Sequence, residues 1–271
     1  MLLAIDVGNT HICMGILDND KILGNFRLTT KTPRTSDEFG ICISTLLARS
    51  KISPDKIDDV IISSVVPKIM YSLTNCIRKY INKEPLIIGP GIKTGIKINQ
   101  DNARSVGADR IVNVSYAYHT FKKPCIIIDF GTATTFCAVS EKAEYLGGTI
   151  APGLKISSEA LFEKTSKLPK VELEEPGHTI CRNTIQSMQS GLVYGHMGMV
   201  EFVVNKMKKE LKETVECSRD PIVVATGGLA TLIDKGAACI DYVDKMLTLE
   251  GLEIIYEKNK KEKRKKCTNV K

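Results

Sequence analysis

The sequence predicts an α/β protein built from two related halves, each with a mixed β-sheet flanked by helices. Apolar, strand-like runs alternate with segments of helical periodicity along the chain, which is typical of α/β folds. In addition, the opening LLAIDVGNTHICMGILDNDKILG of residues 2–24 has a counterpart in CIIIDFGTATTFCAVSEKAEYLGG of residues 125–148. In both stretches an apolar run meets Asp-x-Gly, and a further apolar strand follows a polar turn.

The two stretches align over their whole length. A shift of 123 positions superposes four pairs without a gap: Asp6 and Asp129, Gly8 and Gly131, Leu23 and Leu146, and Gly24 and Gly147. A single shared Asp-x-Gly arises easily by chance, whereas four matches at one offset favour an internal repeat. We therefore expect an N-terminal half at 1–120, a C-terminal half at 121–257, and a basic tail at 258–271.

The first half begins with three expected strands, at 2–8, 12–17 and 21–29. A helix should start near Thr35 or Ser36, because Thr35 and Glu38 have the spacing of a capping box and an apolar stripe follows. The next expected elements are a strand at 58–66, a helix at 68–81, a strand at 85–89 and a helix at 106–121.

In the second half the repeated strands within 125–148 precede helices at about 154–167 and 183–213. A strand at 221–228 and a last helix at 248–260 complete the expected order. Within the long helix, Gly191, Gly195 and Gly198 share one face, although each glycine costs a helix about 1 kcal/mol relative to alanine. Such a face suits the close approach of another helix, from the same chain or from a second subunit.

Composition favours a cytoplasmic protein. The chain has 271 residues with 43% hydrophobic and 25% charged residues, which is ordinary for a globular protein. We see no secretory leader and no apolar run of about 18 residues, so we expect no membrane partner. The nine cysteines form no CxxC pair, which suits a reducing compartment and argues against a zinc site or a disulfide framework.

Most of the net charge of +7 lies in the tail at 257–271, which holds eight Lys or Arg residues and two Glu residues. We expect this tail to be a solvated, disordered end. Contact with nucleic acid or a membrane surface is the weaker alternative, because the tail lacks interleaved aromatic residues. We therefore expect no nucleic-acid partner.

Asp6 and Asp129 each end an apolar strand beside a glycine, where a carboxylate is costly unless a cation or a bound water pairs with it. The turns that follow, 8–10 and 131–135, offer backbone N–H groups and hydroxyls that suit phosphate. We therefore expect the two turns to hold a nucleoside triphosphate and a divalent cation. The glycine turn ATGG at 225–228 would let a base or ribose approach the backbone. The sequence contains no GxxxxGK[ST] motif.

Five motifs, in this order, resemble the type III pantothenate kinase family. They are DVGNT at 6–10, GADR at 107–110, DFGTATT at 129–135, GGTIAPG at 147–153 and ATGG at 225–228. This family belongs to the superfamily of acetate kinase, sugar kinases, heat-shock-70 proteins and actin. The resemblance reaches to about residue 255. It implies two duplicated ribonuclease H-like, actin-like ATPase domains with mixed five-stranded sheets.

The resemblance also implies an activity. Members of the family phosphorylate pantothenate to 4'-phosphopantothenate with ATP, the first step of coenzyme A biosynthesis. They use Mg²⁺ and a monovalent cation, K⁺ or NH₄⁺, and they are homodimers with the active site at the subunit interface.

Site residues are carried over from the matching motifs. Asp109 corresponds to the catalytic base, Asp129 to the ligand of the monovalent cation, and Asp6 to a ligand of Mg²⁺ through water. The expected ATP contacts are Asp6, Val7, Gly8, Asn9, Thr10, His11, Ile12, Cys13 and Thr132. The expected pantothenate contacts are Gln100, Gly107, Ala108, Asp109, Arg110 and Thr184.

Several of these positions also have a purely structural interpretation. GADR can be a helix opening in which the helix dipole favours Asp109, and Asp129 can cap the turn that follows it. Thr184 can be the first residue of a helix that Asn183 caps. The chain also departs from the family: Gln100 and Ala103 stand where a tyrosine and a proline are usual, which alters part of the expected pantothenate pocket, and His11 stands where asparagine is common.

Two other functions remain open at this stage. The first alternative to a pantothenate kinase is a non-catalytic nucleotide-binding regulatory relative. The second is another kinase of the superfamily, with a sugar or acyl acceptor. The presence of Asp6, Asp109 and Asp129 together favours an enzyme over the regulatory relative.

Overall fold

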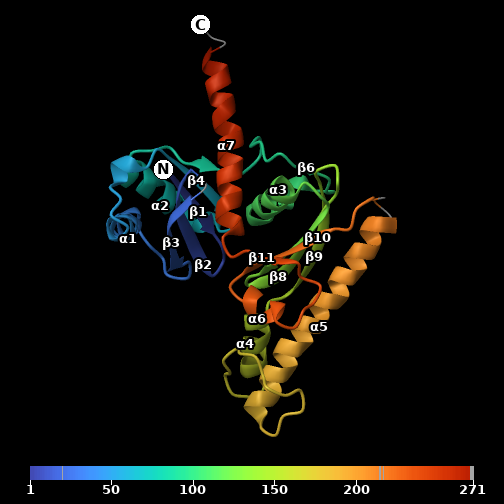
Figure 1. Cartoon of the computed structure of the whole chain (residues 1–271). Coiled ribbons are helices and arrows are strands. Elements are labelled where there is room, and N and C mark those ends of the chain that lie inside the picture. The colour runs from blue at the N-terminus through green and yellow to red at the C-terminus, as the bar shows by residue number, and fades with distance from the viewer. Residues whose placement is uncertain (20, 214, 216, 269–271) are drawn as a thin grey trace. The chain divides into compact units, whose positions relative to one another are not determined.

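The computed structural model describes residues 1–19, 21–213, 215 and 217–268 (Figure 1). Side chains are described as far as residue 260. It confirms an α/β fold with two mixed sheets flanked by helices. The chain forms two compact units. The first unit contains Met1–Ile96, Asn102–His119 and Leu247–Lys271, and the second contains Lys97–Asp101 and Thr120–Met246. The units therefore differ from the continuous halves expected at 1–120 and 121–257.

The first unit is built on a five-stranded sheet with the order β3-β2-β1-β4-β5. Its strands are β1 (Leu2–Val7), β2 (His11–Asp18), β3 (Lys21–Thr29), β4 (Asp59–Ser64) and β5 (Leu86–Ile87). The first three strands form an antiparallel meander, whereas β4 is parallel to β1 and β5 is parallel to β4. The carboxyl ends of β1 and β4 therefore lie at the same edge of the sheet.

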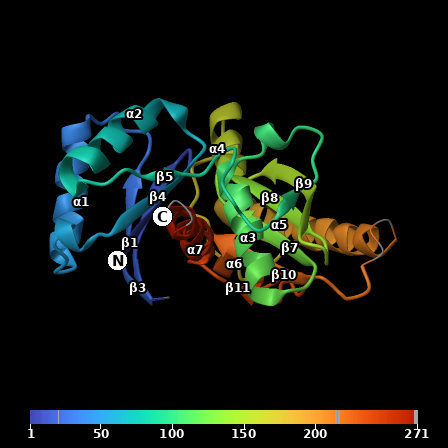
Figure 2. The same ribbon diagram turned by 90° about the horizontal axis from the view of Figure 1, so that it is seen from above.

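Helices cover both faces of this sheet. In Figure 2, α1 (Ser36–Arg49) and α2 (Pro67–Cys76) lie on one side of it and α7 (Leu247–Thr268) lies on the other. The expected capping box of α1 is present, because Glu38 N donates to Thr35 Oγ1 at 3.3 Å and Thr35 N donates to Glu38 Oε2 at 2.7 Å. The remaining helical segments are a π-helical turn at Ile77–Ile81, short 3-10 turns at Pro54–Lys56 and Ala103–Ser105, and α3 (Ala108–Phe121).

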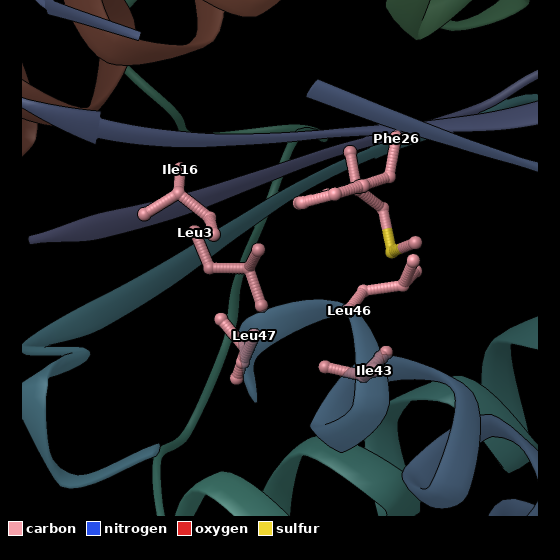
Figure 3. A pocket seen from close by; sticks show the side chains of 7 residues that line it. Leu3, Ile16, Phe26, Ile43, Leu46 and Leu47 are labelled. Atoms are coloured by element: carbon pink, nitrogen blue, oxygen red, sulfur yellow. The ribbon is translucent and has the colours of Figure 1, made fainter. Parts of the chain in front are cut away.

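The core between the sheet and α1 contains one small void (Figure 3). Its volume is about 10 Å³, at the lower limit of what can hold one water molecule. A buried water needs two to four polar partners. The lining offers none, since it consists of Leu3, Met14, Ile16, Phe26, Ile43, Leu46 and Leu47. The void is therefore a dry packing gap and no ligand site.

The second unit repeats the first sheet and extends it. Its order is β11-β10-β7-β8-β9-β6, so the first five strands repeat the order β5-β4-β1-β2-β3. The sixth strand is β6, which pairs parallel to the edge strand β9. The strands are β6 (Lys97–Ile98), β7 (Cys125–Phe130), β8 (Ala133–Val139), β9 (Glu144–Pro152), β10 (Ile222–Gly227) and β11 (Tyr242–Val243).

The β-bulges show the repeat at the level of single residues. Leu23 is skipped in the pairing of β2 with β3, and Leu146 is skipped in the pairing of β8 with β9. These two leucines are equivalent under the shift of 123 positions found in the sequence. A bulge changes strand twist locally and is a specific feature of a sheet, so its recurrence at equivalent residues supports the internal repeat.

The long helix α5 (Thr184–Glu213) packs a buried apolar stripe on the second sheet, together with α4 (Leu154–Lys164) and α6 (Ala230–Asp234). The segment 165–183 between α4 and α5 contains no helix or strand. It is held on α5 by side-chain hydrogen bonds, from Gln189 Nε2 to the carbonyl of Glu172 at 3.0 Å and from the Tyr194 hydroxyl to the carbonyl of Pro176 at 2.6 Å.

Helix α7 continues into the region expected to be a disordered tail. The Tyr256 hydroxyl donates to the carboxylate of Asp59, and Asn259 forms a reciprocal pair of hydrogen bonds with the backbone of Lys93, at 3.0 and 3.1 Å. The start of the expected tail, near 258, is therefore helical and docked. The rest of that prediction concerns side chains from residue 261 on and residues 269–271, which lie outside the described part. No helix within the described ranges has the length and apolar character needed to cross a bilayer.

Candidate functional site

Asp6 occupies the next-to-last position of β1, and its side chain is half-buried. Because Ile5 and Val7 belong to the core below α1 and α2, strand alternation directs Asp6 to the opposite face of the sheet. Its register partners are Cys13 on β2 and Ser63 on β4. Asp6 Oδ1 is shielded from solvent.

The turn after β1 is fixed by its own backbone and by Thr30. Gly8 N donates to the carbonyl of His11 at 3.0 Å, Thr30 Oγ1 donates to the carbonyl of Gly8 at 2.7 Å, and Thr30 N donates to the carbonyl of Thr10 at 3.0 Å. These bonds hold the expected phosphate turn in one conformation, with Asn9 and His11 exposed. Thr30 carries no local sequence signal, because it reaches this turn only through the pairing of β3 with β2.

The GADR motif forms the start of α3. Asp109 is the second residue of that helix and is half-buried, and its Oδ1 accepts a hydrogen bond from Arg110 N at 2.8 Å. A Cβ atom on Gly107 would lie 2.5 Å from Asp109 Oδ1 and 3.5 Å from Val65 Cγ1. Glycine at 107 therefore leaves the space that the Asp109 carboxylate uses, and the positive end of the helix dipole favours a carboxylate there.

Asp6 and Asp109 lie at the same edge of the first sheet. Val65 directly follows β4, and Val65 N donates to the carbonyl of Val7 at the end of β1 at 3.0 Å. Since Gly107 faces Val65, the start of α3 lies at the carboxyl ends of β1 and β4, where Asp6 also lies. The structure thus gathers residues 6–13 and 107–110 around one edge of one unit.

The second unit carries the equivalent turn. Asp129 is half-buried on β7, where its register partners are Thr135 and Thr226. Gly153 and Gly227 lack a side chain, so their backbone can pack closely on the end of β7 and on the turn that follows β7. A Cβ atom on Gly153 would lie 2.2 Å from the carbonyl oxygen of Thr132, and one on Gly227, whose φ is +95°, would lie 2.7 Å from the backbone of Phe130.

The remaining expected site residues are also in the second unit. Thr132 is exposed in the turn, and Thr184 is the exposed first residue of α5. Asn183 caps this helix, since its Oδ1 accepts from Gln186 N at 2.9 Å. Gln100 is half-buried beside Gly147, and a Cβ atom there would lie 2.8 Å from Gln100 Nε2. The expected pantothenate contacts are therefore divided, with 107–110 in the first unit and Gln100 and Thr184 in the second.

The donor set suits a hydrated cation better than a protein cage. Among the described residues, no group of three or more His, Cys, Asp or Glu side chains could enclose a metal ion. Mg²⁺ usually keeps several waters and takes one or two carboxylates together with phosphate oxygens. Asp6, beside a turn suited to phosphate, fits that mode of binding. Asp129 offers carboxylate oxygens at the end of β7, a ligand type that also suits a monovalent cation.

Solved structures share this fold. A protein assigned to the Baf family of transcriptional activators from Campylobacter jejuni matches with a TM-score of 0.58 at 18% identity, over 96% of this chain and 99% of that one. A protein assigned as a 2-dehydro-3-deoxygalactonokinase from Sinorhizobium meliloti matches with a TM-score of 0.58 at 12% identity, over 94% and 96%. The activator of 2-hydroxyisocaproyl-CoA dehydratase from Clostridium difficile, solved with ADPNP, matches with a TM-score of 0.52 at 12% identity, over 97% of both chains.

The sheet order is repeated in the two units, and an aspartate turn ends the first strand of each. The model of the type III pantothenate kinase family matches residues 2–206. The chain belongs to this family, and its membership supports a phosphotransferase. The match contains the first four motifs and ends before the glycine turn at 225–228.

Proposed function

We propose that this protein transfers the γ-phosphoryl group of ATP to the primary hydroxyl of pantothenate and releases ADP and 4'-phosphopantothenate. The observation that carries the proposal is the family match across 2–206, within which Asp109 stands at the start of α3 at the same sheet edge as Asp6. Phosphoryl transfer to an alcohol needs positioning, neutralisation of charge and an acceptor for the hydroxyl proton. At this edge the Asp109 carboxylate can accept the hydroxyl proton, and the Asp6 carboxylate can hold the cation that neutralises charge.

Asp109 is the proposed acceptor of the hydroxyl proton. As that proton moves to its carboxylate, the substrate oxygen forms a bond to the γ-phosphorus and the bond from the γ-phosphorus to the bridging oxygen of ADP breaks. The bond from Arg110 N to Asp109 Oδ1 fixes the carboxylate before substrate arrives. The Arg110 guanidinium is suited to a carboxylate such as that of pantothenate.

The two turns are the proposed contacts of ATP. In the first unit, residues 6–13 offer the fixed turn after β1, and in the second unit Thr132 offers an exposed hydroxyl. Mg²⁺, held by Asp6 through water, would neutralise the developing phosphate charge. Asp129 would hold K⁺ or NH₄⁺. A cytoplasmic location belongs to the same proposal.

A homodimer is also part of the proposal, and α5 supplies its support. Gly191, Gly195 and Gly198 are exposed, and no atom of the described residues outside the helix's own backbone would lie within 4 Å of a Cβ atom at any of them. Phe202 continues the same stripe at helical spacing and is 65% exposed. The described residues supply no packing partner for this glycine face, which supports its use as an interface with a second subunit. Sedimentation of Gly195→Leu should show weaker self-association than that of the wild type.

The test is an acceptor screen with the purified full chain. ATP, Mg²⁺ and K⁺ are supplied with pantothenate, with sugars or with acyl acceptors, and products are identified by mass spectrometry. We expect phosphopantothenate alone, a large loss of rate when Na⁺ replaces K⁺, and a rate reduced by about 10²–10⁴ in Asp109→Asn, the contribution of general base catalysis.

The screen also separates the alternatives. A phosphorylated sugar or acyl product would assign the chain to another activity of the superfamily. Binding of ATP without turnover of any acceptor would indicate a regulatory relative. Wild-type turnover by Asp109→Asn would remove Asp109 from the role of proton acceptor.

A further inference from the structure

Ser63 carries a buried hydroxyl that has no hydrogen-bond partner in the part of the chain that the structure describes. It lies on β4 and is 0% exposed, and Oγ forms no hydrogen bond to any described residue. Other buried hydroxyls of the first unit are satisfied: Ser115 Oγ donates to the carbonyl of Thr94 at 2.6 Å, and Thr74 Oγ1 donates to the carbonyl of Met70 at 2.7 Å. Because an unpaired buried hydroxyl is unfavourable and uncommon, Ser63 requires an explanation.

The register of the sheet places this hydroxyl beside Asp6. Ser63 and Asp6 are paired residues of the parallel strands β4 and β1, which are about 4.8 Å apart in such sheets. Val60 and Ile62 of β4 face the same core as Ile5 and Val7 of β1, so Ser63 and Asp6 both point to the other face. Ser63 Oγ and Asp6 Oδ1 are both shielded from solvent. A donor thus stands next to the carboxylate assigned to the nucleotide and its cation.

We propose that Ser63 is a positioning residue whose hydroxyl donates a hydrogen bond to the Asp6 carboxylate when the cation-bearing nucleotide is bound. The inference rests on the proposed function only in requiring that Asp6 serve a metal-bound nucleotide; the identity of the acceptor does not matter. A carboxylate has about four acceptor positions on its two oxygens. With one oxygen turned toward the hydrated cation, a donor on the other fixes the orientation of the group and favours its ionised form.

The main test compares the affinity for ADP with Mg²⁺ and for ADP with EDTA, by calorimetry on the full chain. In Ser63→Ala we expect binding of Mg·ADP to weaken about tenfold, the size of one hydrogen bond to a charged group, and metal-free ADP to bind as it does to the wild type. Equal Mg·ADP affinity in wild type and variant would overturn the inference, and so would an equal loss with and without metal.

Stability supplies a readout that separates positioning from folding. Since Ser63 Oγ forms no hydrogen bond with the described residues, Ser63→Ala should unfold at the same temperature as the wild type or higher. Ser115→Ala is the matched control, because it removes a buried serine hydroxyl that is bonded; it should unfold earlier and keep the Mg·ADP affinity. A marked drop in the melting temperature of Ser63→Ala would show a structural bond and contradict the inference.

A double-mutant cycle tests the partner. Asp6→Asn should weaken Mg·ADP binding, and adding Ser63→Ala to it should cause little further loss if the hydroxyl acts through the Asp6 carboxylate. Additive losses would contradict this. A wild type that binds Mg·ADP and phosphorylates no pantothenate would refute the proposed function and leave the role of Ser63 decided by these affinities; a wild type that binds no Mg·ADP would refute both.

Discussion

Thr134 Oγ1 lies 2.9 Å from Nε2 of His196, and this buried hydrogen bond joins β8 to α5. Thr134 belongs to the DFGTATT turn, and His196 belongs to the helix that begins at Thr184. The His196 ring also packs near Phe130, with 6.0 Å between ring centroids. One side chain of α5 thus supports Thr134 in the expected phosphate turn of the second unit and Phe130 directly before that turn.

The burial of His196 predicts a stability that depends on pH. Burial lowers the pKa of His196 below its usual value of 6.5, so in mild acid the unfolded chain binds a proton more readily than the folded one. This contribution to stability is complete above about pH 6.5 and is lost as the pH falls toward the lowered folded pKa.

His196→Gln should remove that dependence, because glutamine keeps hydrogen-bonding capacity toward Thr134 and does not titrate. Urea unfolding from pH 8 to pH 5 should show a steeper loss of the free energy of unfolding in the wild type than in the variant. Identical pH profiles for the two proteins would refute the prediction.

Local pattern was enough to predict the elements that have local signals. The capping box of Thr35 and Glu38 starts α1 as expected, and the repeat found from the sequence recurs in the bulges at Leu23 and Leu146. The short elements β6, β11 and α6 went unnoticed, because two to five residues carry too little periodicity to distinguish them.

Features that depend on tertiary contact could not be predicted. The place of α7 in the first unit rests on contacts such as Gly15 with Leu249 and Gly251 with Val112, which bring together residues distant in sequence. Ser63 has a visible signal, since two serines interrupt the apolar run 58–66, but its neighbour across the sheet is known only through the register of β4 with β1. For the site residues, the motifs predicted positions at strand ends and helix starts. The neighbours of each side chain could not be predicted, because they depend on the fold.

Gly153→Ala should disturb the turn of the second unit. A Cβ atom there would lie 2.2 Å from the Thr132 carbonyl oxygen and 2.8 Å from that of Gly131, so backbone must shift. We expect the free energy of unfolding to fall by about 1–3 kcal/mol, as for other overpacked sites, and ATP to bind more weakly. Gly177→Ala is the control, since nothing lies within 4 Å of a Cβ atom at that position. Equal melting temperatures and affinities for the two variants would contradict the prediction.

Tyr256→Phe should loosen the docking of α7. Burial, followed by the hydrogen bond to Asp59, raises the pKa of Tyr256, so the hydroxyl keeps its proton and acts as a donor. Removing a hydrogen bond to a charged group should lower the free energy of unfolding by about 2 kcal/mol, as measured by urea unfolding. Tyr71→Phe, at a side chain that is 79% exposed, should change it by less than about 0.5 kcal/mol. An unchanged free energy of unfolding in Tyr256→Phe would show that the hydrogen bond to Asp59 does not contribute to the docking of α7.

Gly107→Ala tests whether the position of the Asp109 carboxylate limits catalysis. The new Cβ atom would lie 2.5 Å from Asp109 Oδ1, and because that atom ends a side chain, the carboxylate can rotate away at little cost to the fold. We therefore expect a loss of at most about 1 kcal/mol of stability, the difference between glycine and alanine before a helix. The turnover number should nevertheless fall by about 10²-fold, as it does for a displacement of about 1 Å in other enzymes. Gly89→Ala, where nothing lies within 4 Å of a Cβ atom, should leave both quantities unchanged. Since ATP binds without help from Asp109 in this proposal, its affinity should be equal in Gly107→Ala and the wild type. A variant with wild-type turnover would mean that the reaction tolerates a displaced Asp109.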